Sequence, residues 1–467
     1  MTLGLDLHLD LSPVRPGRSL EVALRSAIID GQLTPDTRLP AARTLAADLG
    51  ISRNTVADVY AQLAAEGWLE SRVGAGTWVS ARSPSYVRTG PRQRAVNRRS
   101  IDLRGGIPDT AAFARREWAS AARQATLDAT SAELGYPDPA GTTKLRGALT
   151  SYVARTRGVV VERERVVVGH GFGELLVLVC RALRQRGATR IAVEEYGHDT
   201  HRRLIAATGL TPVPVAVDED GADVRTLATL DVSAVVLTPA HQFPVGVPLA
   251  ADRRRWLAGW AQRVDALVIE DDYDGEFRYD RRAIGALQSL APQQVAYLGT
   301  ASKAVAPGVG LAWAVLPTWL LPDVLEQRTL AGGQPAALQQ LALARFVDGH
   351  DYDRTVRRLR ATYRSRRRRL EEVVADQLPG CEVAGLAAGL QCLLALPAGA
   401  SEEAVRQEAA ARGLLVEGLG SFHFGSGQRA HEPAMVVGYG GPTPGQYETA
   451  LALLVESIRA SVRRSAD

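Results

Sequence analysis

Lysine is almost missing from this chain of 467 residues. Lys144 and Lys303 are the two lysines, and the other 53 basic residues are arginines. Arginine stays protonated and does not form a Schiff base with an aldehyde. Chemistry that needs a primary amine side chain is therefore confined to two positions. Lys144 stands in GTTKLRG, where an arginine would serve equally well, so Lys303 is the candidate of interest.

Cysteine and long apolar runs are also scarce. The three cysteines, Cys180, Cys381 and Cys392, form no CxxC pair, and we expect them to be reduced thiols in a cytoplasmic protein. No apolar stretch reaches the roughly 18–20 residues that cross a bilayer, and no signal segment opens the chain, so we expect no membrane partner. No metal is expected, because His198 and His201 have no cysteine or placed carboxylate beside them to complete a site.

The net charge of +4 comes from one short segment. Residues 1–80 hold seven arginines against nine acidic residues, residues 81–100 hold six arginines and no acid, and the rest of the chain is balanced. A stretch rich in proline and arginine between two patterned regions predicts a linker over residues 81–101. Two interpretations stay open for this linker, namely a solvated tether and a contact to an anionic polymer.

The first 80 residues predict three short helices and a β-hairpin. Apolar residues recur at helical spacing from Ser19, a second short helix ends at Gly50, and Ser52 is a good N-cap for a third helix. Two extended runs after Gly67 flank RVGAG and indicate a hairpin. This is the plan of a winged helix-turn-helix, whose third helix enters the DNA major groove. A small helical domain that binds protein is the alternative, and the segment's net charge of −2 favours it slightly.

The start of the third helix has the chemistry to contact DNA. It offers hydroxyl, guanidinium and amide groups together with an exposed helix N-terminus, which favours phosphate. The residues concerned are Ser52, Arg53, Asn54 and Thr55. The expected DNA face also carries Arg38, Arg43 and Arg72, while the acidic residues fall mostly on other helix faces.

Residues 31–79 resemble the GntR-type winged helix almost end to end. The resemblance is carried by the turn GxLxPxxRLP, the helix start SRNTV and the wing GxGT at residues 74–77. It implies double-stranded DNA as the partner. The contacts that it implies to phosphates and bases come from Arg38, Arg43, Ser52, Arg53, Asn54 and Thr55, with Gly76 in the wing.

From about residue 102 the chain alternates strand-like apolar runs with helical segments. This alternation predicts an α/β domain with a parallel or mixed sheet, and such sheets bind ligands at the carboxyl ends of their strands. Five loops at predicted strand ends are rich in polar or glycine residues, namely GHGFG, EEYGH, HQFP, EDDYD and TASK. Packing alone explains five such clusters poorly, so we expect a ligand site there.

Pyridoxal phosphate is one cofactor that accounts for these clusters. Lys303 can form an imine with its aldehyde, and Asp271 can hold a protonated pyridine nitrogen. The backbone N–H groups of the turn 169–173, with the hydroxyls of Thr300 and Ser302, can receive the phosphate. Each element alone is ambiguous, since a lone lysine is usually a surface residue and an Asp-Asp pair equally suits Mg²⁺.

Residues 102–460 resemble the fold-type I aminotransferases, and their fusion to a GntR-type winged helix is the plan of the MocR-type transcriptional regulators. The matching stretches are GYPDPAG, LTPAHQFPVG, VIEDDYDGEFRY and YLGTASKAVAPG. The resemblance implies Lys303 as the Schiff-base lysine, Asp271 against the pyridine nitrogen and Tyr273 at the phenolic oxygen of the cofactor. It also implies phosphate contacts by Thr300 and Ser302, and a head-to-tail homodimer.

Several positions depart from the family pattern. Gly310 stands where an arginine commonly reaches the phosphate, and His198 stands where an aromatic ring usually stacks on the pyridine. The polar residues usual in the phosphate turn are replaced by Gly171, Phe172 and Gly173, and the strand around Met435 has no arginine for a substrate carboxylate. Without one charged phosphate partner, cofactor binding is weaker by about 1.5–3 kcal/mol, or roughly ten- to a hundredfold.

The sequence therefore predicts an N-terminal winged helix-turn-helix over residues 1–80, joined by a linker to an α/β aminotransferase-like domain over residues 102–467. The predicted function is that of a DNA-binding transcriptional regulator without turnover, which senses pyridoxal phosphate or an amine or amino-acid effector that reacts with it. Two alternatives stay open: a sensor domain that has lost pyridoxal phosphate and binds another small molecule, and a pyridoxal-phosphate-dependent aminotransferase. The arginine-rich run 353–372 is either a solvated helix or an auxiliary DNA or partner surface.

Overall fold

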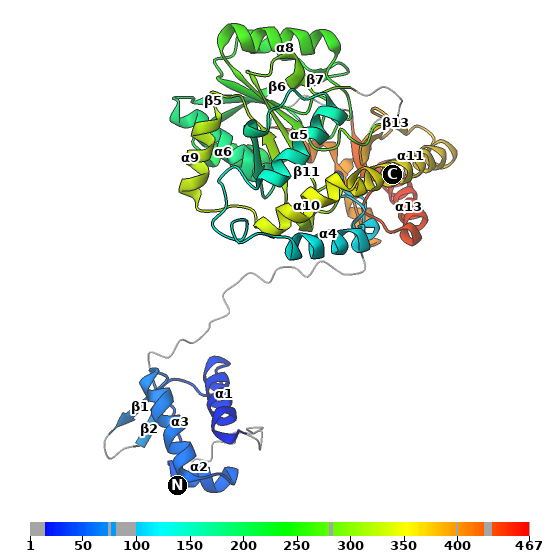
Figure 1. Cartoon of the computed structure of the whole chain (residues 1–467). Coiled ribbons are helices and arrows are strands. Elements are labelled where there is room, and N and C mark those ends of the chain that lie inside the picture. Colours follow the sequence, from blue (N-terminus) through cyan, green and yellow to red (C-terminus); the bar gives the residue numbers. More distant parts are fainter. Residues whose placement is uncertain are drawn as a thin grey trace. The chain divides into compact units, whose positions relative to one another are not determined.

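The chain divides into two compact units, residues 1–95 and residues 96–467 (Figure 1). The computed structural model describes residues 15–72, 76–80, 100–279, 284–397, 400–424 and 432–466. Residues 81–99, which make up most of the predicted linker, and residues 73–75 of the wing lie outside the described residues.

The N-terminal unit has the three helices and the hairpin that the sequence predicts. Its elements are α1 (Pro16–Ile29), α2 (Ala42–Leu49), α3 (Arg53–Ala65), β1 (Leu69–Arg72) and β2 (Gly76–Val79). The strands are antiparallel, with Leu69 opposite Val79. Leucines of α1 and the apolar face of α3, including Val56 and Leu63, share one buried core. The winged helix-turn-helix is therefore confirmed.

The C-terminal unit is built on a seven-stranded sheet. Its strands are β4 (Val166–Gly169), β5 (Arg190–Glu194), β6 (Thr211–Val215), β9 (Ala234–Leu237), β10 (Leu267–Asp272), β11 (Val295–Thr300) and β12 (Ala312–Val315). Their spatial order is β4-β12-β11-β10-β9-β5-β6, and β12 alone runs antiparallel to its neighbours. The parallel strands consequently end at one edge of the sheet, which is where the α/β class places ligands.

Helices cover both faces of this sheet (Figure 1). They are α4 (Arg115–Leu127), α5 (Thr143–Arg157), α6 (Phe172–Gln185), α7 (Asp199–Ala207), α8 (Ala251–Val264), α9 (Leu321–Ala331) and α10 (Ala337–Asp348). Successive residues of a strand point to opposite faces. Accordingly Val268 of β10 belongs to the core beneath α8, while Ile269 belongs to the core beneath α6 and α9.

A second, four-stranded antiparallel sheet follows in the order β13-β14-β17-β16. Its strands are β13 (Glu382–Ala384), β14 (Gln391–Ala395), β16 (Glu417–Gly418) and β17 (Ala434–Gly438), and its helices are α11 (Asp351–Gln377), α12 (Glu402–Ala411) and α13 (Tyr447–Ala466). Short pairs join β3 (Ile101–Asp102) to β15 (Leu414–Leu415), and β7 (Val217–Asp218) to β8 (Gly221–Ala222). Within the described ranges, no helix is both long and apolar enough to cross a bilayer.

Candidate functional site

A cavity opens at the carboxyl edge of the large sheet. It encloses about 940 Å³, counting the part open to solvent. The structure brings seven of the predicted cofactor residues to its wall, namely Phe172, His198, Asp271, Tyr273, Thr300, Ser302 and Lys303. They lie at or just beyond the carboxyl ends of β4, β5, β10 and β11, which explains why residues 130 positions apart in the chain meet here.

The amine of Lys303 lies in this cavity. Its Nζ donates a hydrogen bond of 2.6 Å to the backbone oxygen of Gly106. Burial lowers the pKa of the lysine, although the carboxylates of Asp274 and Asp271 oppose that shift. A lowered pKa increases the neutral fraction of the amine, and the neutral amine is the form that attacks an aldehyde.

Asp271 is buried at the end of β10, with 8% of its surface exposed. Burial and the neighbouring charge of Asp272 raise the pKa of Asp271 well above its usual range, while Lys303 acts in the opposite direction. A carboxylate in this setting is stabilised by any cationic group placed beside it. A protonated ring nitrogen is such a group.

The phenol of Tyr273 is held by two side chains. Gln391 donates a hydrogen bond of 2.8 Å to its oxygen, and Nδ1 of His241 lies 3.1 Å from the same oxygen. The other contact of this ring nitrogen is Oδ2 of Asp274, at 2.8 Å. Sequence reasoning missed Gln391, which lies 118 positions from Tyr273 and has no local signal. His241 stands in the HQFP loop, where its polar character gave a usable hint.

The predicted phosphate turn forms the start of α6. Gly171 is the N-cap of this helix and Gly173 lies in its first turn; neither lines the cavity, whereas Phe172 between them does. Close by, Oγ1 of Thr300 lies 2.9 Å from Oγ of Ser302 and accepts a hydrogen bond of 3.1 Å from that residue's backbone N–H. The start of α6 thus offers helix N–H groups to an anion, and Thr300 and Ser302 offer two hydroxyls.

Gly310 has a left-handed backbone with φ of +63°. The nearest atom to a Cβ built there is the backbone oxygen of His170, at 3.9 Å, so the space beside Gly310 is open. Arg202 is the arginine on the described cavity wall, and it donates to the backbone oxygen of Phe422 at 3.0 Å. A Cβ at position 310 would therefore meet no close atom, although the left-handed backbone disfavours any side chain there.

Aromatic rings line the other side of the cavity. The ring of His198 stacks on the ring of Phe243, with ring centroids 4.1 Å apart and an interplanar angle of 21°. The ring centroids of Phe172 and His201 are 4.7 Å apart. Burial, with the nearby charges of Lys303 and Arg202, lowers the pKa of His198 to about 4. Burial and the neighbouring His198, Lys303 and Arg202 lower the pKa of His201 to about 3. Both rings are therefore neutral at neutral pH.

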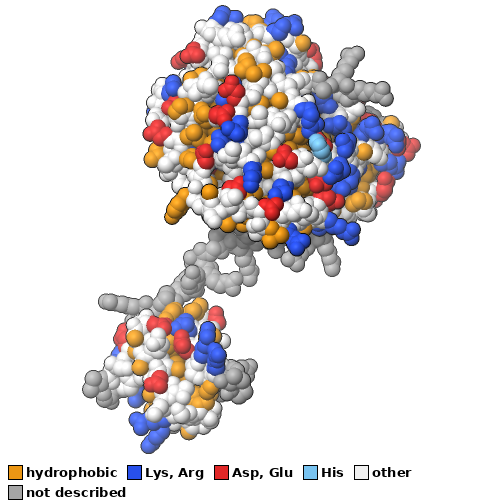
Figure 2. Space-filling model, viewed as in Figure 1, with side chains coloured by type: hydrophobic (Ala, Val, Ile, Leu, Met, Phe, Trp, Pro, Cys, Tyr) orange, Lys and Arg blue, Asp and Glu red, His pale blue; other side chains and the backbone are white. Residues whose placement is uncertain are grey.

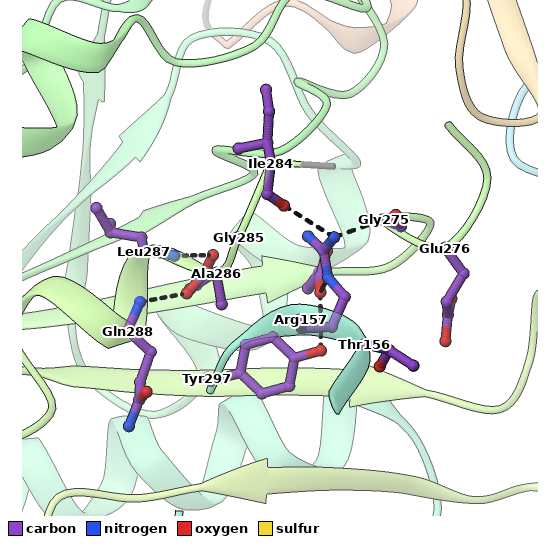
Figure 3. A network of polar contacts seen from close by, with 12 residues as sticks. Thr156, Arg157, Gly275, Glu276, Ile284, Gly285, Ala286, Leu287, Gln288 and Tyr297 are labelled. Atoms are coloured by element: carbon purple, nitrogen blue, oxygen red, sulfur yellow. Dashed lines mark hydrogen bonds and ion pairs between the residues drawn. The ribbon is translucent and has the colours of Figure 1, made fainter. Parts of the chain in front are cut away.

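A buried ion pair anchors the turn behind Asp271 (Figure 3). Arg157 donates from Nε to Oδ2 of Asp272 at 2.6 Å and from Nη2 to Oδ1 at 3.0 Å, and Tyr297 donates to Oδ2 at 2.7 Å. The remaining nitrogen of Arg157 donates to the backbone oxygens of Gly275 and Ile284. Removing one partner of such a pair costs about 3–5 kcal/mol. The network therefore fixes the chain on both sides of Tyr273.

The strand β17 of the small sheet carries no cation. All five residues of Ala434–Gly438 are buried. Val436 of this strand belongs to an apolar cluster with Phe243, Leu393 and Phe422. A substrate carboxylate would find no positively charged partner on this strand, as its sequence indicates.

The second candidate site is the start of α3 in the N-terminal unit. Oγ of Ser52 accepts a hydrogen bond of 3.0 Å from the backbone N–H of Thr55, which makes it the helix N-cap. The predicted DNA residues Arg38, Arg43, Ser52, Arg53, Asn54 and Gly76 are exposed, and Thr55 is half-buried. Exposed cations beside a capped helix N-terminus suit a phosphate backbone.

Comparison with known proteins identifies both units. The family of class I and II aminotransferases matches residues 100–431, and the gntR family of bacterial regulatory proteins matches residues 16–79. The chain is 34% identical over 445 residues to the HTH-type pyridoxine biosynthesis transcriptional regulator PdxR of Corynebacterium glutamicum, covering 93% of this chain and 95% of that protein. It is 32% identical to the probable rhizopine catabolism regulatory protein MocR of Rhizobium meliloti, over 75% of each chain.

This chain belongs to the MocR-type transcriptional regulators. The solved structures that this regulator resembles are aminotransferases at low identity, and they show its fold alone. One is a kynurenine aminotransferase of Pyrococcus horikoshii, with a TM-score of 0.68, 22% identity, and coverage of 77% of this chain and 91% of that one. Another is the alpha-aminoadipate aminotransferase LysN of Thermus thermophilus, with a TM-score of 0.70, 20% identity, and coverage of 80% and 96%. The predicted fold-type I domain and the regulator role are thus confirmed.

Proposed function

We propose that the C-terminal domain of this MocR-type regulator binds pyridoxal phosphate at Lys303, and that this cofactor, or an amine or amino acid that reacts with it, is the signal. The observation that carries the proposal is the meeting of one buried amine, one buried carboxylate, one phenol and two hydroxyls in a single cavity. Each of these groups matches one functional group of pyridoxal phosphate, so the residues fit the cofactor.

Each side chain has a distinct task in this proposal. Lys303 offers a primary amine, and bound pyridoxal phosphate supplies the aldehyde with which amines condense. Asp271 holds a proton on the ring nitrogen through its negative charge. Tyr273, held by Gln391 and His241, directs its phenol to the phenolic oxygen of the ring. Thr300 and Ser302 bind the phosphate together with the start of α6.

We further propose that the domain senses its ligand without catalytic turnover. The buried apolar strand β17 has no cation to orient an amino-acid carboxylate. Orientation of the reacting group contributes strongly to catalysis, so a site without it favours binding over reaction. Sustained transamination of amino acids by the purified protein would contradict this part of the proposal.

The cofactor assignment is tested by colour and covalent trapping. Purified protein mixed with pyridoxal phosphate should turn yellow, and borohydride should attach the cofactor permanently to the peptide that contains Lys303. The Lys303→Ala variant should do neither. Lys144→Ala is the matched control, because Lys144 is the other lysine and lies on the surface in an ion pair with Glu133. If the wild-type protein stays colourless, the cofactor assignment is wrong, and the domain would be a sensor for another small molecule.

We propose that DNA is bound through the start of α3 and the adjacent exposed arginines. Arg53→Ala should abolish the shift of a duplex that the wild-type protein selects from a random pool, while cofactor binding persists. Arg18→Ala is the control, since Arg18 is exposed on α1. An unchanged shift with Arg53→Ala would exclude α3 as the recognition helix.

We also propose that the regulator acts as a homodimer. Leu127 at the end of α4, Tyr136 and Leu330 at the end of α9 are 70%, 104% and 74% exposed in the single chain. Large apolar side chains left this exposed are candidates for burial in a protein interface. A two-fold dimer would present two winged helices to two half-sites of DNA.

A further inference from the structure

The arginine-rich helix α11 sorts its arginines into two classes. Nine arginines lie between Arg354 and Arg369. Five of them lie within 4 Å of a carboxylate, namely Arg354, Arg366, Arg367, Arg368 and Arg369. The other four, Arg357, Arg358, Arg360 and Arg364, have no ion pair with any described residue. The positive charge of the helix is therefore compensated on some faces and uncompensated on others.

Three of the uncompensated arginines line one groove. Arg357, Arg360 and Arg364 stand at positions i, i+3 and i+7 of α11 and share the groove with Arg155 of α5 and Arg278. Residues at this spacing lie along one face of a helix. At 1.5 Å per residue, they extend over about 10 Å along the helix axis. Lys and Arg side chains gather on the part of the C-terminal unit that bears α11 (Figure 2).

The acidic groups of this groove do not cancel its charge. Asp353 is already paired with Arg155, at 2.9 Å. The carboxylate of Glu276 accepts hydrogen bonds of 3.1 Å from Tyr152 and Tyr352, and burial together with the charge of Asp272 raises its pKa to about 7.

Two of the groove's arginines are free to reach a ligand. The third, Arg360, donates a hydrogen bond of 2.9 Å from Nε to the backbone oxygen of Glu276. Because that oxygen carries no formal charge, the charge of Arg360 stays uncompensated. Arg357 and Arg364 are exposed. They have no hydrogen-bond partner among the described residues.

We propose that this groove is a second DNA-binding surface, which contacts the phosphate backbone of DNA through Arg357, Arg360 and Arg364. The proposal rests on DNA binding by the winged helix, which supplies the polyanion. Phosphate contacts of this kind add affinity and salt dependence without reading the base sequence. The surface lies on the aminotransferase-like domain, and its arginines are not among the residues that line the cavity proposed for the cofactor.

The spacing of the arginines favours a polymer over a small anion. A single phosphorylated metabolite is held by cations that converge on one point. Here the uncompensated guanidinium groups follow the helix axis, as expected for successive phosphates of a strand. A small anionic ligand in the groove is the competing outcome, and the experiment separates the two.

The test compares two pairs of arginines on the same helix. The variant Arg357→Gln/Arg364→Gln removes two exposed, uncompensated charges. The control Arg354→Gln/Arg368→Gln removes two exposed charges that pair with Asp351 and Glu372. Both full-length proteins are titrated, over a range of salt concentrations, against a duplex that ends at the selected site and against the same site extended by several helical turns.

On the extended duplex, the slope of log K against log salt should fall by about 1 for each phosphate that the Arg357→Gln/Arg364→Gln variant no longer binds, and should not change in the control. On the short duplex all proteins should bind alike, which shows that the winged helix is intact. Equal slopes on the extended duplex would overturn the proposal. Binding of inorganic pyrophosphate is measured by calorimetry in parallel. If the slopes are equal and only the Arg357→Gln/Arg364→Gln variant loses pyrophosphate binding, the groove binds a small anion instead.

Discussion

At the scale of single residues, the cavity proposed for the cofactor combines a buried amine with a proposed phosphate site that has no arginine at position 310. Lys303 is buried beside two acidic residues and keeps a contact to a backbone oxygen. Gly310 stands where the family commonly has an arginine, and the nearest atom to a Cβ built there is 3.9 Å away. Weakened phosphate binding suits a sensor, because a ligand that dissociates within the physiological concentration range reports that concentration.

The first prediction concerns this gap. Gly310→Arg should tighten pyridoxal phosphate binding by roughly tenfold, measured by absorbance titration. A charged hydrogen bond contributes about 1.5–3 kcal/mol, and a side chain at this left-handed position costs about 1–2 kcal/mol. Gly310→Leu carries the same backbone cost without the charge and should not tighten binding. Equal affinities of the Arg and Leu variants would contradict a phosphate contact from position 310.

The second prediction concerns Glu194, which lines the cavity. Burial raises its pKa to about 7 from an ordinary value of 4.5. Between these values the folded chain holds a proton that the unfolded chain releases, so this group's contribution to stability is full below pH 4.5 and is lost as the pH rises through 7. Glu194→Gln cannot ionise and should gain thermal stability over wild type, by a few degrees, as the pH is raised.

The Glu194→Gln substitution can keep the hydrogen bonds that the Glu194 side chain accepts. Thr238 and Gln242 both donate to one carboxylate oxygen of Glu194, and a glutamine oxygen can accept in its place. Thermal unfolding of the cofactor-free protein at about pH 5 and pH 8 measures the difference. If the difference in melting temperature between the two proteins is the same at both pH values, Glu194 does not titrate in this range.

At the scale of elements, the wing and the turn before α2 form one cationic unit. The guanidinium carbon of Arg72 lies 4.9 Å from the ring centre of Trp78, and that of Arg38 lies 5.9 Å from it. Arg72 is also paired with Asp36 at 2.9 Å. A Cβ added to Gly76 would lie 3.3 Å from Nε of Arg38. Gly76 therefore admits the arginine to the wing, and Trp78 orients it.

The third prediction follows from this arrangement. Trp78→Leu should weaken DNA binding about three- to tenfold, because it removes cation–π contacts worth about 0.5–1 kcal/mol each. Trp78→Tyr keeps a ring and should recover most of the affinity. In an Arg38→Gln background, Trp78→Leu should have a smaller further effect, because only the contact with Arg72 is then left to lose. Fully additive losses would mean that Trp78 acts independently of Arg38.

At the scale of the whole molecule, the proposed homodimer determines how one signal reaches two DNA half-sites. The exposed leucines at the ends of α4 and α9 are the apolar groups that this proposed dimer would cover. Each subunit would add its own winged helix and its own α11 groove. Salt dependence of operator binding would then reflect both surfaces of both subunits.

The fourth prediction tests this interface. Leu127→Glu/Leu330→Glu should shift the protein from dimer to monomer in sedimentation velocity, because two charges replace apolar side chains that the proposed dimer would bury. Val264→Glu is the control, since Val264 is also exposed, at 55%, but lies at the end of α8. Unchanged sedimentation of the double variant, or a wild-type protein that is monomeric at all concentrations, would exclude this interface.

The sequence alone determined the winged helix and the α/β class. In the first 80 residues the N-cap Ser52, the helical spacing and the turn before Leu39 all lie within a few residues of the elements that they specify, so local physics is sufficient. The scarcity of lysine singled out Lys303 before any fold was known. The five polar loops predicted a site at strand ends, since parallel strands end at one edge.

Only the tertiary structure decided which groups complete each site. The oxygen of Gly106 reaches Lys303 across 197 positions, and Gln391 reaches Tyr273 across 118. The arginines of α11 look alike in sequence. Arg354, Arg367 and Arg368 pair with carboxylates of the helix itself. Asp109 and Glu448 reach Arg366 and Arg369 from distant segments, while no described carboxylate pairs with Arg357 or Arg364. Periodicity is a local property of the chain, whereas the partner of a buried or charged group depends on which distant segments the fold brings beside it.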